Sequence, residues 1–565
     1  MKLSLASLFL GLVVLSLQNQ EAPRVKTPFG AIRGEYRKSQ HGRTYEAYEG
    51  IPYAEPPLGR LRFQPPKPVK KWLYELPATK KGSICTQFLM SPLNGDRVTG
   101  CEDCLYLNIY VPSRTDNKTL PVIFWIHGGA FQFSTFNEVN ETRLMDRKVI
   151  LITSNYRLGP FGFLSTGDRV VPGNMGLKDQ STALLWVSEN IIHFGGNSKN
   201  ITLIGLSAGG ASVHFHYMSP LSAGLFQRGI SISGVALDSW VQTERAPDKA
   251  KKLGALMGCP TNSTYRMVDC LRHRPARLIS QAVGEFMFWL YNPFTPFGTV
   301  IEHQKCPKPF ITDSPIELIR QGKLMDVPWI SGVVSEEGLY PAAEFVADDK
   351  LLKHLNDNWD DIAPYLLDYN NTIPLSQHKD VAEKARKHYL GSKEISRHTT
   401  RQLIHMIGDR LFSSDFEKAV RLQAAVNKSP VWAYYYTYRA THSLSEFLSN
   451  SDRNFGVSHA DDAFLIFNTQ IANTTKPEDL RMQKLLVDFY ISFAINGKPK
   501  IGHAKWKALN HEDERFRFLR IAGPRNISMT CSNNFAEKKF WNTINFDENT
   551  INYNIAEMSS IVESE

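Results

Sequence analysis

The sequence predicts an α/β fold in which helices flank a mostly parallel central sheet. Along residues 121–236, compact apolar runs alternate with stretches of helical periodicity, and this alternation implies crossover connections between parallel strands. Hydrophobic residues make up 42% of the 565 residues and charged residues 21%, which is ordinary for a globular protein with a large core. No repeat or Pro/Gly/Ser-rich linker divides the chain. We therefore expect one domain over residues 19–565, with a small antiparallel hairpin region at its N-terminal end.

Each element of this alternation carries its own local signal. The run Pro121–Gly129 is apolar and β-rich and predicts a buried strand, and residues 148–159 predict a second. The segments NITLIGL, residues 200–206, and RGISISGVA, residues 228–236, predict a third and a fourth strand. Within residues 176–197, apolar residues recur at near-helical spacing before two glycines and predict a helix: Leu177, Leu184, Val187 and Ile191.

Ser207 stands between the third predicted strand and the next predicted helix. Gly205 and Gly209 flank it at two-residue spacing, and residues 208–218 form a helical stretch that stops before a proline. A nucleophilic serine at the carboxyl end of a strand needs a sharp turn and close packing, which would explain both glycines. The helix start also offers the Ala208 N–H group to a developing negative charge. We interpret Ser207 as a nucleophile rather than as a small residue at a turn.

A serine nucleophile needs a base, and the base needs an orienting acid. In enzymes that place the serine at a strand-to-helix turn, the acid and then the histidine follow it along the chain. A predicted strand, VPWISGVV, ends at Glu336 and Glu337, and an aromatic-rich strand, PVWAYYYTYR, precedes the loop that holds His459. His442 lies nearer to that strand and is a rival, and a glutamate pair is also typical of a solvated surface. The residues alone leave both positions open.

Gly128 and Gly129 follow the first predicted strand and are candidates for an oxyanion hole. Glycines at this point leave backbone N–H groups open to a substrate oxygen, and one such donor typically contributes about 3 kcal/mol of transition-state stabilisation. The alternative is an ordinary glycine turn. The aromatic region 286–302 either packs in the core or lines an apolar acyl pocket, with Phe131 and Phe464 as further candidates for that pocket.

Two segments are the most specific motifs of the chain: FGGNSKNITLIGLSAG, residues 194–209, and EDCLYLNIYVP, residues 102–112. Together with GNMGLKDQ and LRFQPP, they resemble the type-B carboxylesterase and lipase family, the relatives of the cholinesterases. The similarity extends from Arg62 to His459 and so covers most of the chain. It implies an α/β-hydrolase fold and hydrolysis of carboxylic esters through an acyl-enzyme on Ser207, with no cofactor and no metal.

The resemblance also implies roles for single residues. The family's acid lies in an acidic-Glu-Gly run, which corresponds to Glu337, and its histidine lies in a Gly-x-x-His pattern, which corresponds to His459 and not to His442. The family's oxyanion hole corresponds to three backbone N–H groups, those of Gly128, Gly129 and Ala208.

The cysteines follow the family pattern in part. The resemblance implies the disulfides Cys85–Cys104 and Cys259–Cys270. Cys101 breaks the pattern just before EDCL and could compete with Cys104. Cys306 and Cys531 are candidates for a further pair. No cysteine is spaced with histidines as a zinc site would be.

Departures from the family narrow the substrate. The loop TQFLMSPLNGDRVTG lacks the tryptophan with which cholinesterases hold choline by cation–π contact. Leu206 stands where juvenile hormone esterases carry a glutamine. Residues 209–240 look most like insect β-type esterases, which include detoxifying, odorant-degrading and venom carboxylesterases. Because apolar pockets discriminate weakly between neighbouring substrates, we expect broad specificity for apolar small to medium esters, xenobiotics included.

The N-terminal residues predict secretion. Lys2 precedes an uncharged apolar run, Leu3–Leu17, which is typical of a signal peptide and short for a membrane span. We place the signal peptide at residues 1–18, with cleavage between 16 and 20, and no later segment reads as a transmembrane helix. Pro430 follows the serine of an eighth, doubtful sequon at Asn427. Seven sequons are candidates for N-glycosylation: Asn117, Asn140, Asn200, Asn262, Asn370, Asn473 and Asn526.

The charge distribution argues against nucleic acid as a partner. The formal net charge is +9, but lysines and arginines are scattered and form no basic helix. We expect a small-molecule ester as the partner, and a monomer or weak homodimer in solution. Two other classes stay open: an adhesion protein that keeps the fold without catalysis, and a protein that sequesters esters and turns them over slowly.

Overall fold

A long mixed sheet runs through the part of the chain that the computed structural model describes, residues 21–549 apart from 94, 114–117, 136–138 and 468–470. The predicted signal peptide and Asn117 lie outside these residues. The sheet has eleven strands in the order β16-β15-β14-β13-β12-β11-β9-β10-β8-β4-β3. Their bounds are β3 Glu35–Lys38, β4 Thr44–Pro52, β8 Tyr106–Pro112, β9 Leu120–Ile126, β10 Ile150–Ser154, β11 Gly196–Leu206, β12 Arg228–Ile232, β13 Trp329–Val334, β14 Val431–Tyr436, β15 Phe516–Gly523 and β16 Asn526–Ser532.

The middle of this sheet is parallel, from β10 through β9, β11, β12, β13 and β14 to β15. Both ends turn antiparallel, where β8, β4 and β3 follow β10 on one side and β16 follows β15 on the other. The predicted parallel centre is therefore confirmed. The strands expected from the four apolar runs correspond to β9, β10, β11 and β12.

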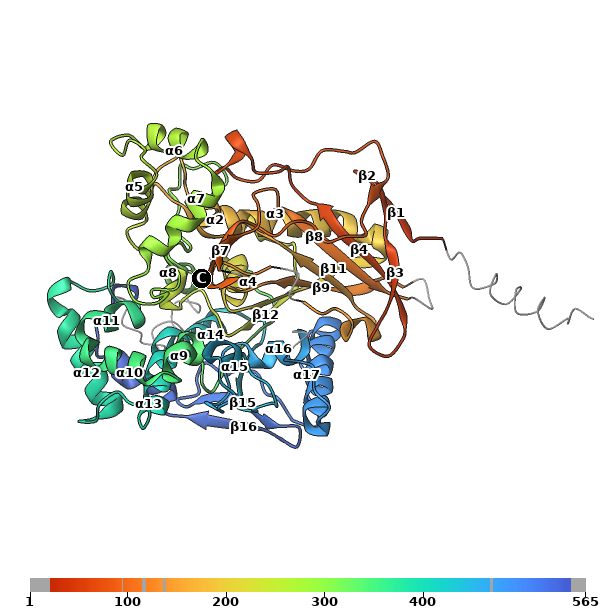
Figure 1. Ribbon diagram of the computed structural model, residues 1–565. Helices are drawn as coiled ribbons and strands as arrows, with labels where there is room; N and C mark the ends of the chain where they lie inside the picture. The colour runs from red at the N-terminus through yellow and green to blue at the C-terminus, as the bar shows by residue number, and fades with distance from the viewer. Residues whose placement is uncertain (1–20, 94, 114–117, 136–138, 468–470, 550–565) are drawn as a thin grey trace, which may run out of the picture.

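Both faces of the sheet are buried, and the side chains of β9 pack on both of them. Phe124 and Ile126 pack on the side of α3 and α4, whereas Ile123 and Trp125 pack on the side of α17. Figure 1 shows α3 and α17 on opposite sides of the sheet. Because successive side chains of a strand point to opposite faces, a strand buried on both must be apolar throughout. This explains the unbroken apolar run that predicted it.

Helices occupy the crossovers, and α10, α11, α12 and α13 gather at the left of Figure 1, away from β3 and β4. Their bounds are α2 Gly159–Phe163, α3 Met175–Asn190, α4 Ala208–Met218, α5 Ala246–Leu256, α6 Thr264–Arg272, α7 Ala276–Gln281, α8 Pro315–Arg320, α9 Leu339–Val346, α10 Asp349–Asp357, α11 Trp359–Leu366, α12 His378–Leu390, α13 Thr400–Gly408, α14 Ser414–Val426, α15 Leu444–Ser449, α16 Asp461–Phe467, α17 Pro477–Asn496 and α18 Lys538–Trp541. The predicted helix within residues 176–197 is α3, which continues as a 3-10 turn to Gly195.

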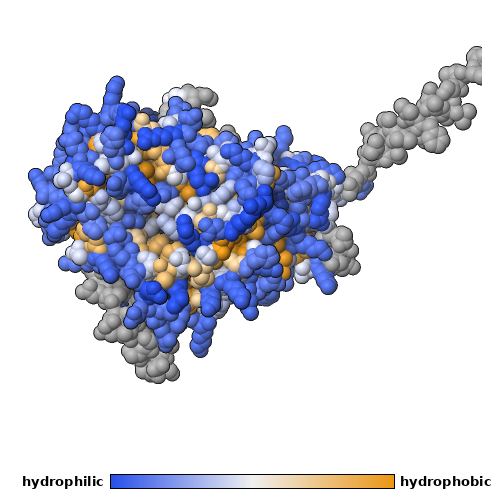
Figure 2. Space-filling model, turned by 90° about the horizontal axis from the view of Figure 1, so that it is seen from below, coloured by the Kyte–Doolittle hydropathy of each residue, from blue (hydrophilic) through white to orange (hydrophobic). Residues whose placement is uncertain are grey.

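Two small sheets accompany the large one. The hairpin of β1 (Arg24–Thr27) and β2 (Gly30–Arg33) is joined by β5 (Leu76–Pro77), and β6 (Gln87–Leu93) pairs with β7 (Asp96–Thr99). The first of these confirms the expected N-terminal hairpin region. On the face seen in Figure 2, apolar residues gather toward the middle, inside a hydrophilic rim. Among the described residues, no helix is long and apolar enough to cross a membrane.

Candidate active site

Ser207 occupies a sharp turn between β11 and α4. Its φ of 58° and ψ of −124° lie outside the regions that non-glycine residues favour, and such strain persists only where surrounding contacts impose it. The Ser207 N–H donates to the Ile232 carbonyl at 2.7 Å. A Cβ on Gly205 would stand 2.1 Å from the Gly209 carbonyl oxygen, and one on Gly209 would stand 2.1 Å from the Ile126 oxygen. The close approach expected of both flanking glycines is therefore present.

His459 and Glu337 meet although they are far apart in the chain. The imidazole Nδ1–H donates to the Glu337 carboxylate at 2.6 Å, and both side chains are buried. The other carboxylate oxygen accepts from the Ser233 hydroxyl at 2.6 Å and the Val334 N–H at 2.8 Å. Three donors thus hold Glu337 in place, and Nε2 of His459 has no hydrogen-bond partner among the described residues. Sequence reasoning did not identify Ser233, which follows β12.

The loop before His459 is fastened to Glu336, the other member of the glutamate pair. The Glu336 carboxylate accepts from the Val457 N–H at 2.7 Å, and its backbone N–H donates to the Val457 carbonyl at 3.1 Å. Gly456 has a φ of +122°, and a Cβ there would stand 2.6 Å from the Glu336 carboxyl carbon. The Gly-x-x-His pattern therefore has a physical cause, because only glycine lets the carboxylate approach the backbone this closely.

Aromatic rings enclose His459 from two sides. The Tyr340 ring stacks with the imidazole at 5.4 Å between centroids, and the Phe412 ring lies at 4.8 Å. Phe412 belongs to a π-helical turn, Asp409–Ser413, between α13 and α14, and single π-turns are frequent at functional sites.

Asp238 is a buried carboxyl group near Glu337. Burial raises the pKa of Asp238 well above its usual range, and the negative charges of Asp415 and Glu337 add to the shift. This favours a neutral Asp238 close to the Glu337 carboxylate.

The rival histidine lies elsewhere. His442 is half-exposed, and its Nδ1 pairs with Glu446 of α15 at 3.3 Å. It is absent from the described residues that line the cavity over Ser207, whereas His459 is among them. The geometry thus joins Glu337 with His459 and leaves His442 apart.

Gly128 and Gly129 lie beside Ser207 at the end of β9. A Cβ on Gly128 would stand 2.7 Å from the Leu206 carbonyl oxygen and 3.0 Å from the Ser207 Cβ. Gly129 has a φ of +96°, and its carbonyl accepts from the N–H groups of Gln132 and Phe133. Within the described part of the chain, the N–H groups of Gly128 and Gly129 have no hydrogen-bond partner.

His127 stabilises the turn formed by Gly128 and Gly129. Its Nδ1–H donates to the Gly128 carbonyl at 2.9 Å, and its ring stacks on Tyr156 at 4.3 Å. The Tyr156 hydroxyl donates to the His127 carbonyl at 3.0 Å. Burial lowers the pKa of His127 to about 4, so the imidazole is neutral at physiological pH. These contacts hold the turn without placing a charge in the cavity.

A cavity of about 300 Å³ opens over Ser207, and both glycines and His459 contribute to its wall. Apolar side chains form most of the rest, among them Trp125, Val139, Leu206, Phe447, Phe464, Phe467 and Ile471. The expectation for Phe464 therefore agrees with this lining, but Phe131 and residues 286–302 are missing from it. Phe131 is fully buried against Phe163, and Phe294 packs on Tyr340, so these rings fill the core. Phe447 of α15 had no signal in the sequence.

Two disulfides join the pairs that the resemblance implies, Cys85–Cys104 and Cys259–Cys270. Cys101, Cys306 and Cys531 are unpaired. The suggested pair of Cys306 with Cys531 is wrong, because Cys306 is buried in the loop before α8 while Cys531 lies on the edge strand β16. Among the described residues, no group of three or more His, Cys, Asp or Glu side chains is arranged to hold a metal ion.

Comparisons with known proteins find insect esterases among the relatives of this chain. A curated relative, venom carboxylesterase-6 of Apis mellifera, is 62% identical over 98% of this chain and 100% of its own length. The carboxylic ester hydrolase of Bombus ignitus is 61% identical over 97% of this chain and 98% of its own, and the juvenile hormone esterase of Tribolium castaneum is 36% identical over 87% and 86%.

A solved structure has the same fold. The crystal structure of juvenile hormone esterase from Manduca sexta, with OTFP covalently attached, superposes with a TM-score of 0.79 over 96% of this chain and 99% of that one, at 25% identity. The sequence model of the carboxylesterase family matches residues 21–541. The chain therefore belongs to the carboxylesterase family and is a carboxylic ester hydrolase of the α/β-hydrolase fold.

Proposed function

We propose that this chain is a secreted serine carboxylesterase that works through an acyl-enzyme on Ser207, with His459 as general base and Glu337 as its orienting acid. The observation that carries the proposal is the 2.6 Å contact between His459 and Glu337 beside a cavity that Ser207 also lines. A buried histidine bound to a buried carboxylate, next to a serine in a strained turn, is the arrangement that activates a hydroxyl.

In the first half-reaction, Nε2 of His459 takes the proton of Ser207 while the serine oxygen attacks the ester carbonyl. The negative charge that develops on the carbonyl oxygen is held by the N–H groups of Gly128, Gly129 and Ala208. Ala208 contributes because it is the first residue of α4, where backbone N–H groups lack helical partners. His459 then passes the proton to the departing alcohol.

In the second half-reaction, His459 activates a water molecule that attacks the acyl-enzyme, and the carboxylate product leaves Ser207 free. Glu337 keeps the imidazole in the tautomer with its proton on Nδ1 and stabilises the imidazolium that forms in both steps. The three donors to Glu337, from His459, Ser233 and Val334, hold the carboxylate in place through both steps.

The cavity favours apolar small to medium esters, xenobiotics among them. Its wall offers aliphatic and aromatic surface, with few polar groups away from the reacting centre. Apolar walls discriminate weakly between substrates that differ by a methylene, which supports broad specificity. The Apis mellifera relative carries the word venom in its name, and this supports secretion of the present chain as well.

The sequons support the same compartment. Asn262, Asn473 and Asn526 are exposed, so a glycan can be attached to them without rearrangement. The doubtful Asn427 has its side-chain nitrogen buried, which agrees with leaving it out. We propose the three exposed sites as the occupied ones.

Hydrolysis of a naphthyl butyrate by the secreted, mature protein tests the proposal. We expect the wild type to release naphthol and butyrate at equal steady-state rates, after a burst of naphthol when acylation outruns deacylation, and we expect loss of both products with Ser207→Ala. If a folded wild-type sample binds the ester without releasing butyrate, the sequestering alternative replaces this proposal.

A further inference from the structure

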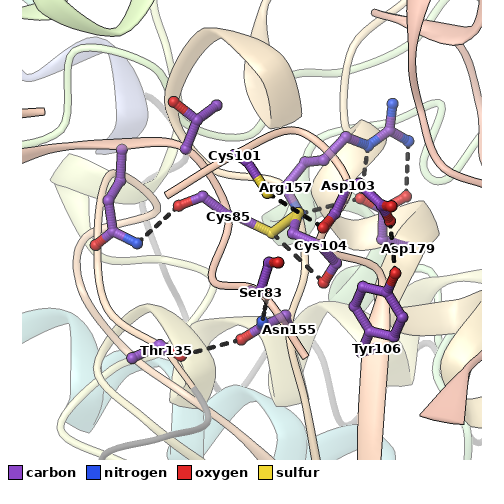
Figure 3. The surroundings of a disulfide bond; sticks show 12 residues. Ser83, Cys85, Cys101, Asp103, Cys104, Tyr106, Thr135, Asn155, Arg157 and Asp179 are labelled. Carbon is purple, nitrogen blue, oxygen red and sulfur yellow. Dashed lines mark hydrogen bonds and ion pairs between the residues drawn. A yellow bond between two sulfur atoms is a disulfide. The ribbon is translucent and has the colours of Figure 1, made fainter. Parts of the chain in front are cut away.

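Cys101 lies beside the disulfide of Cys85 and Cys104 and is itself unpaired (Figure 3). Cys101 is exposed, whereas both bonded cysteines are buried. All three side chains line one small cavity of about 10 Å³. A thiolate next to a disulfide sulfur is the starting arrangement of thiol–disulfide exchange, which proceeds by direct attack of one on the other.

Backbone hydrogen bonds hold Cys101 and Cys85 side by side. The Cys101 N–H donates to the Ile84 carbonyl at 3.0 Å, the Thr86 N–H donates to the Cys101 carbonyl at 2.9 Å, and the two cysteines form a parallel β-bridge. Chains paired in this way lie about 4.8 Å apart. This is within the range of roughly 4.4 to 6.8 Å between Cα atoms that a disulfide spans.

Cys85 therefore has two partners within bonding reach. Its Cα atom is 4.9 Å from that of Cys104, the partner to which it is bonded. The bridge sets a similar separation from Cys101, and bridged residues project their side chains to the same side of the chain pair. The Cys101 thiol is held in place by a hydrogen bond from Sγ to the Asp103 carbonyl at 3.3 Å.

We propose that Cys101 and Cys104 exchange as the disulfide partner of Cys85. The Cys101 thiolate attacks Sγ of Cys85, the bond between Cys101 and Cys85 forms, and the bond between Cys85 and Cys104 breaks. Cys104 leaves as a thiolate and takes up a proton in place of the one that Cys101 released. Among Cys85, Cys101 and Cys104, one disulfide and one thiol are present before and after the step, so the step consumes no oxidant or reductant.

The exchanging segment is connected to the candidate active site on both sides of Cys85. Gln87 accepts from the Ser134 N–H at 2.8 Å and donates both to the Ser134 carbonyl at 3.2 Å and to the Cys85 carbonyl at 2.9 Å. Ser134 lines the cavity over Ser207. A change of partner at Cys85 therefore acts on a wall of that cavity through one side chain.

A second connection runs from Ser83, as Figure 3 shows. The Asn155 side chain donates to the Ser83 carbonyl at 3.0 Å and accepts from the Thr135 hydroxyl at 3.3 Å. Thr135 also lines the cavity. The two connections reach adjacent residues, 134 and 135, so the disulfide state and the shape of this wall are linked. This link rests on the proposed function, whereas the exchange itself does not.

Trapping of the free thiols tests the exchange without any ester. The wild type and Cys101→Ser are incubated near the ordinary thiol pKa, at about pH 8.5. Exchange is stopped with acid, the chains are unfolded in acid and alkylated with N-ethylmaleimide, and cleavage before Asp103 separates Cys101 from Cys104. The unpaired Cys306 and Cys531 report complete alkylation in both proteins.

We expect alkylated Cys104 in the wild type at least about tenfold above its level in Cys101→Ser, with Cys85 unlabelled in both. The matched variant lacks the attacking thiol and keeps the disulfide. Equal labelling of Cys104 in the two proteins would overturn the proposal. So would label on Cys85 that matches label on Cys104, because reduction would then be opening the bond.

The variant Cys104→Ser tests the link to the active site. We expect it to contain the Cys85–Cys101 disulfide, with no alkylation at Cys101, and to show a severalfold change in KM for naphthyl butyrate with an unchanged active-site titre. Alkylation of both Cys85 and Cys101 in the folded variant would contradict the exchange. The disulfide with an unaltered KM would contradict the link alone. If this variant does not fold, the trapping comparison still decides the exchange.

Discussion

The imidazole of His459 is bound to the carboxylate of Glu337 at 2.6 Å, and the neighbouring Glu336 binds the backbone at Val457 at 2.7 Å. Glu337 thus acts on the histidine by direct contact, whereas Glu336 acts on it through the loop that precedes it. This division of roles leads to a paired prediction.

Glu337→Gln is expected to lower kcat on the order of 10⁴-fold, because the amide neither stabilises the imidazolium nor fixes the reactive tautomer. Glu336→Gln removes the same charge one residue away and keeps an acceptor for the Val457 N–H. We expect its kcat to stay within about tenfold of the wild type. Ester hydrolysis measured on both variants checks the pair, and similar losses in the two would refute the separate roles.

A second pair concerns the glycine turn. In Gly129→Ala the new Cβ would stand 2.0 Å from the Phe133 carbonyl oxygen, whereas Gly224, at a comparable φ of +76°, has nothing within 4 Å. Both variants bear a similar cost of positive φ, but only the first displaces an N–H group of the proposed oxyanion hole. We expect kcat/KM to fall about 10²-fold or more in Gly129→Ala and to change little in Gly224→Ala. Equal kcat/KM values would argue against the turn as an oxyanion hole.

A third prediction concerns the rim of the cavity. Phe447 is 53% exposed and lines the cavity, while Phe288 is 55% exposed and stacks on Tyr365 instead. Phe447→Ala is expected to raise KM for naphthyl butyrate by about five- to thirtyfold, since contact with one aromatic ring contributes roughly 1 to 2 kcal/mol. Phe288→Ala serves as the control, with KM unchanged. If the control raises KM as much, the effect is not one of cavity contact.

A buried histidine predicts how stability depends on pH. His214 stacks on Trp329, its Nδ1 accepts from the Ala236 N–H, and burial lowers its pKa to about 3. Below pH 6.5 the unfolded chain binds a proton that folded His214 does not. As the pH is lowered below 6.5, His214 therefore reduces the free energy of unfolding by about 1.4 kcal/mol per pH unit, until the pH nears 3.

The variant His214→Asn keeps an acceptor for the Ala236 N–H and removes the titration. Its loss of ring packing makes it less stable than the wild type at pH 7.5, but the difference is expected to shrink as the pH falls from 6.5 toward 4. Urea unfolding at several pH values measures this. A difference that stays constant over that range would contradict the role of His214.

The sequence predicted the elements whose signals are local. The apolar run before Gly128 became β9, and the glycines beside Ser207 predicted a tight turn because their cause lies within a few residues. The resemblance then selected His459 over His442, which strand logic alone had left open. The residue that marks His459 in the sequence is Gly456, the glycine of the Gly-x-x-His pattern. Its positive φ and its closeness to Glu336 explain why the pattern requires glycine.

Other parts of the site depend on contacts between distant segments and had no local signal. Ser233 reaches Glu337 because β12 and β13 are neighbours in the sheet. Phe412 reaches His459 through a π-helical turn that periodicity does not reveal. The aromatic region 286–302 was ambiguous for the same reason, because rings that fill a core and rings that line a pocket have identical compositions.

Covalent labelling with a fluorophosphonate tests the central assignment most directly. The phosphonate traps an activated serine held next to an oxyanion hole, so it reports nucleophile, base and hole together. We predict one equivalent of label per folded wild-type chain, on the peptide that contains Ser207, and none in Ser207→Ala. A folded wild-type protein that stays unlabelled, or that carries the label on another serine, would contradict the assignment.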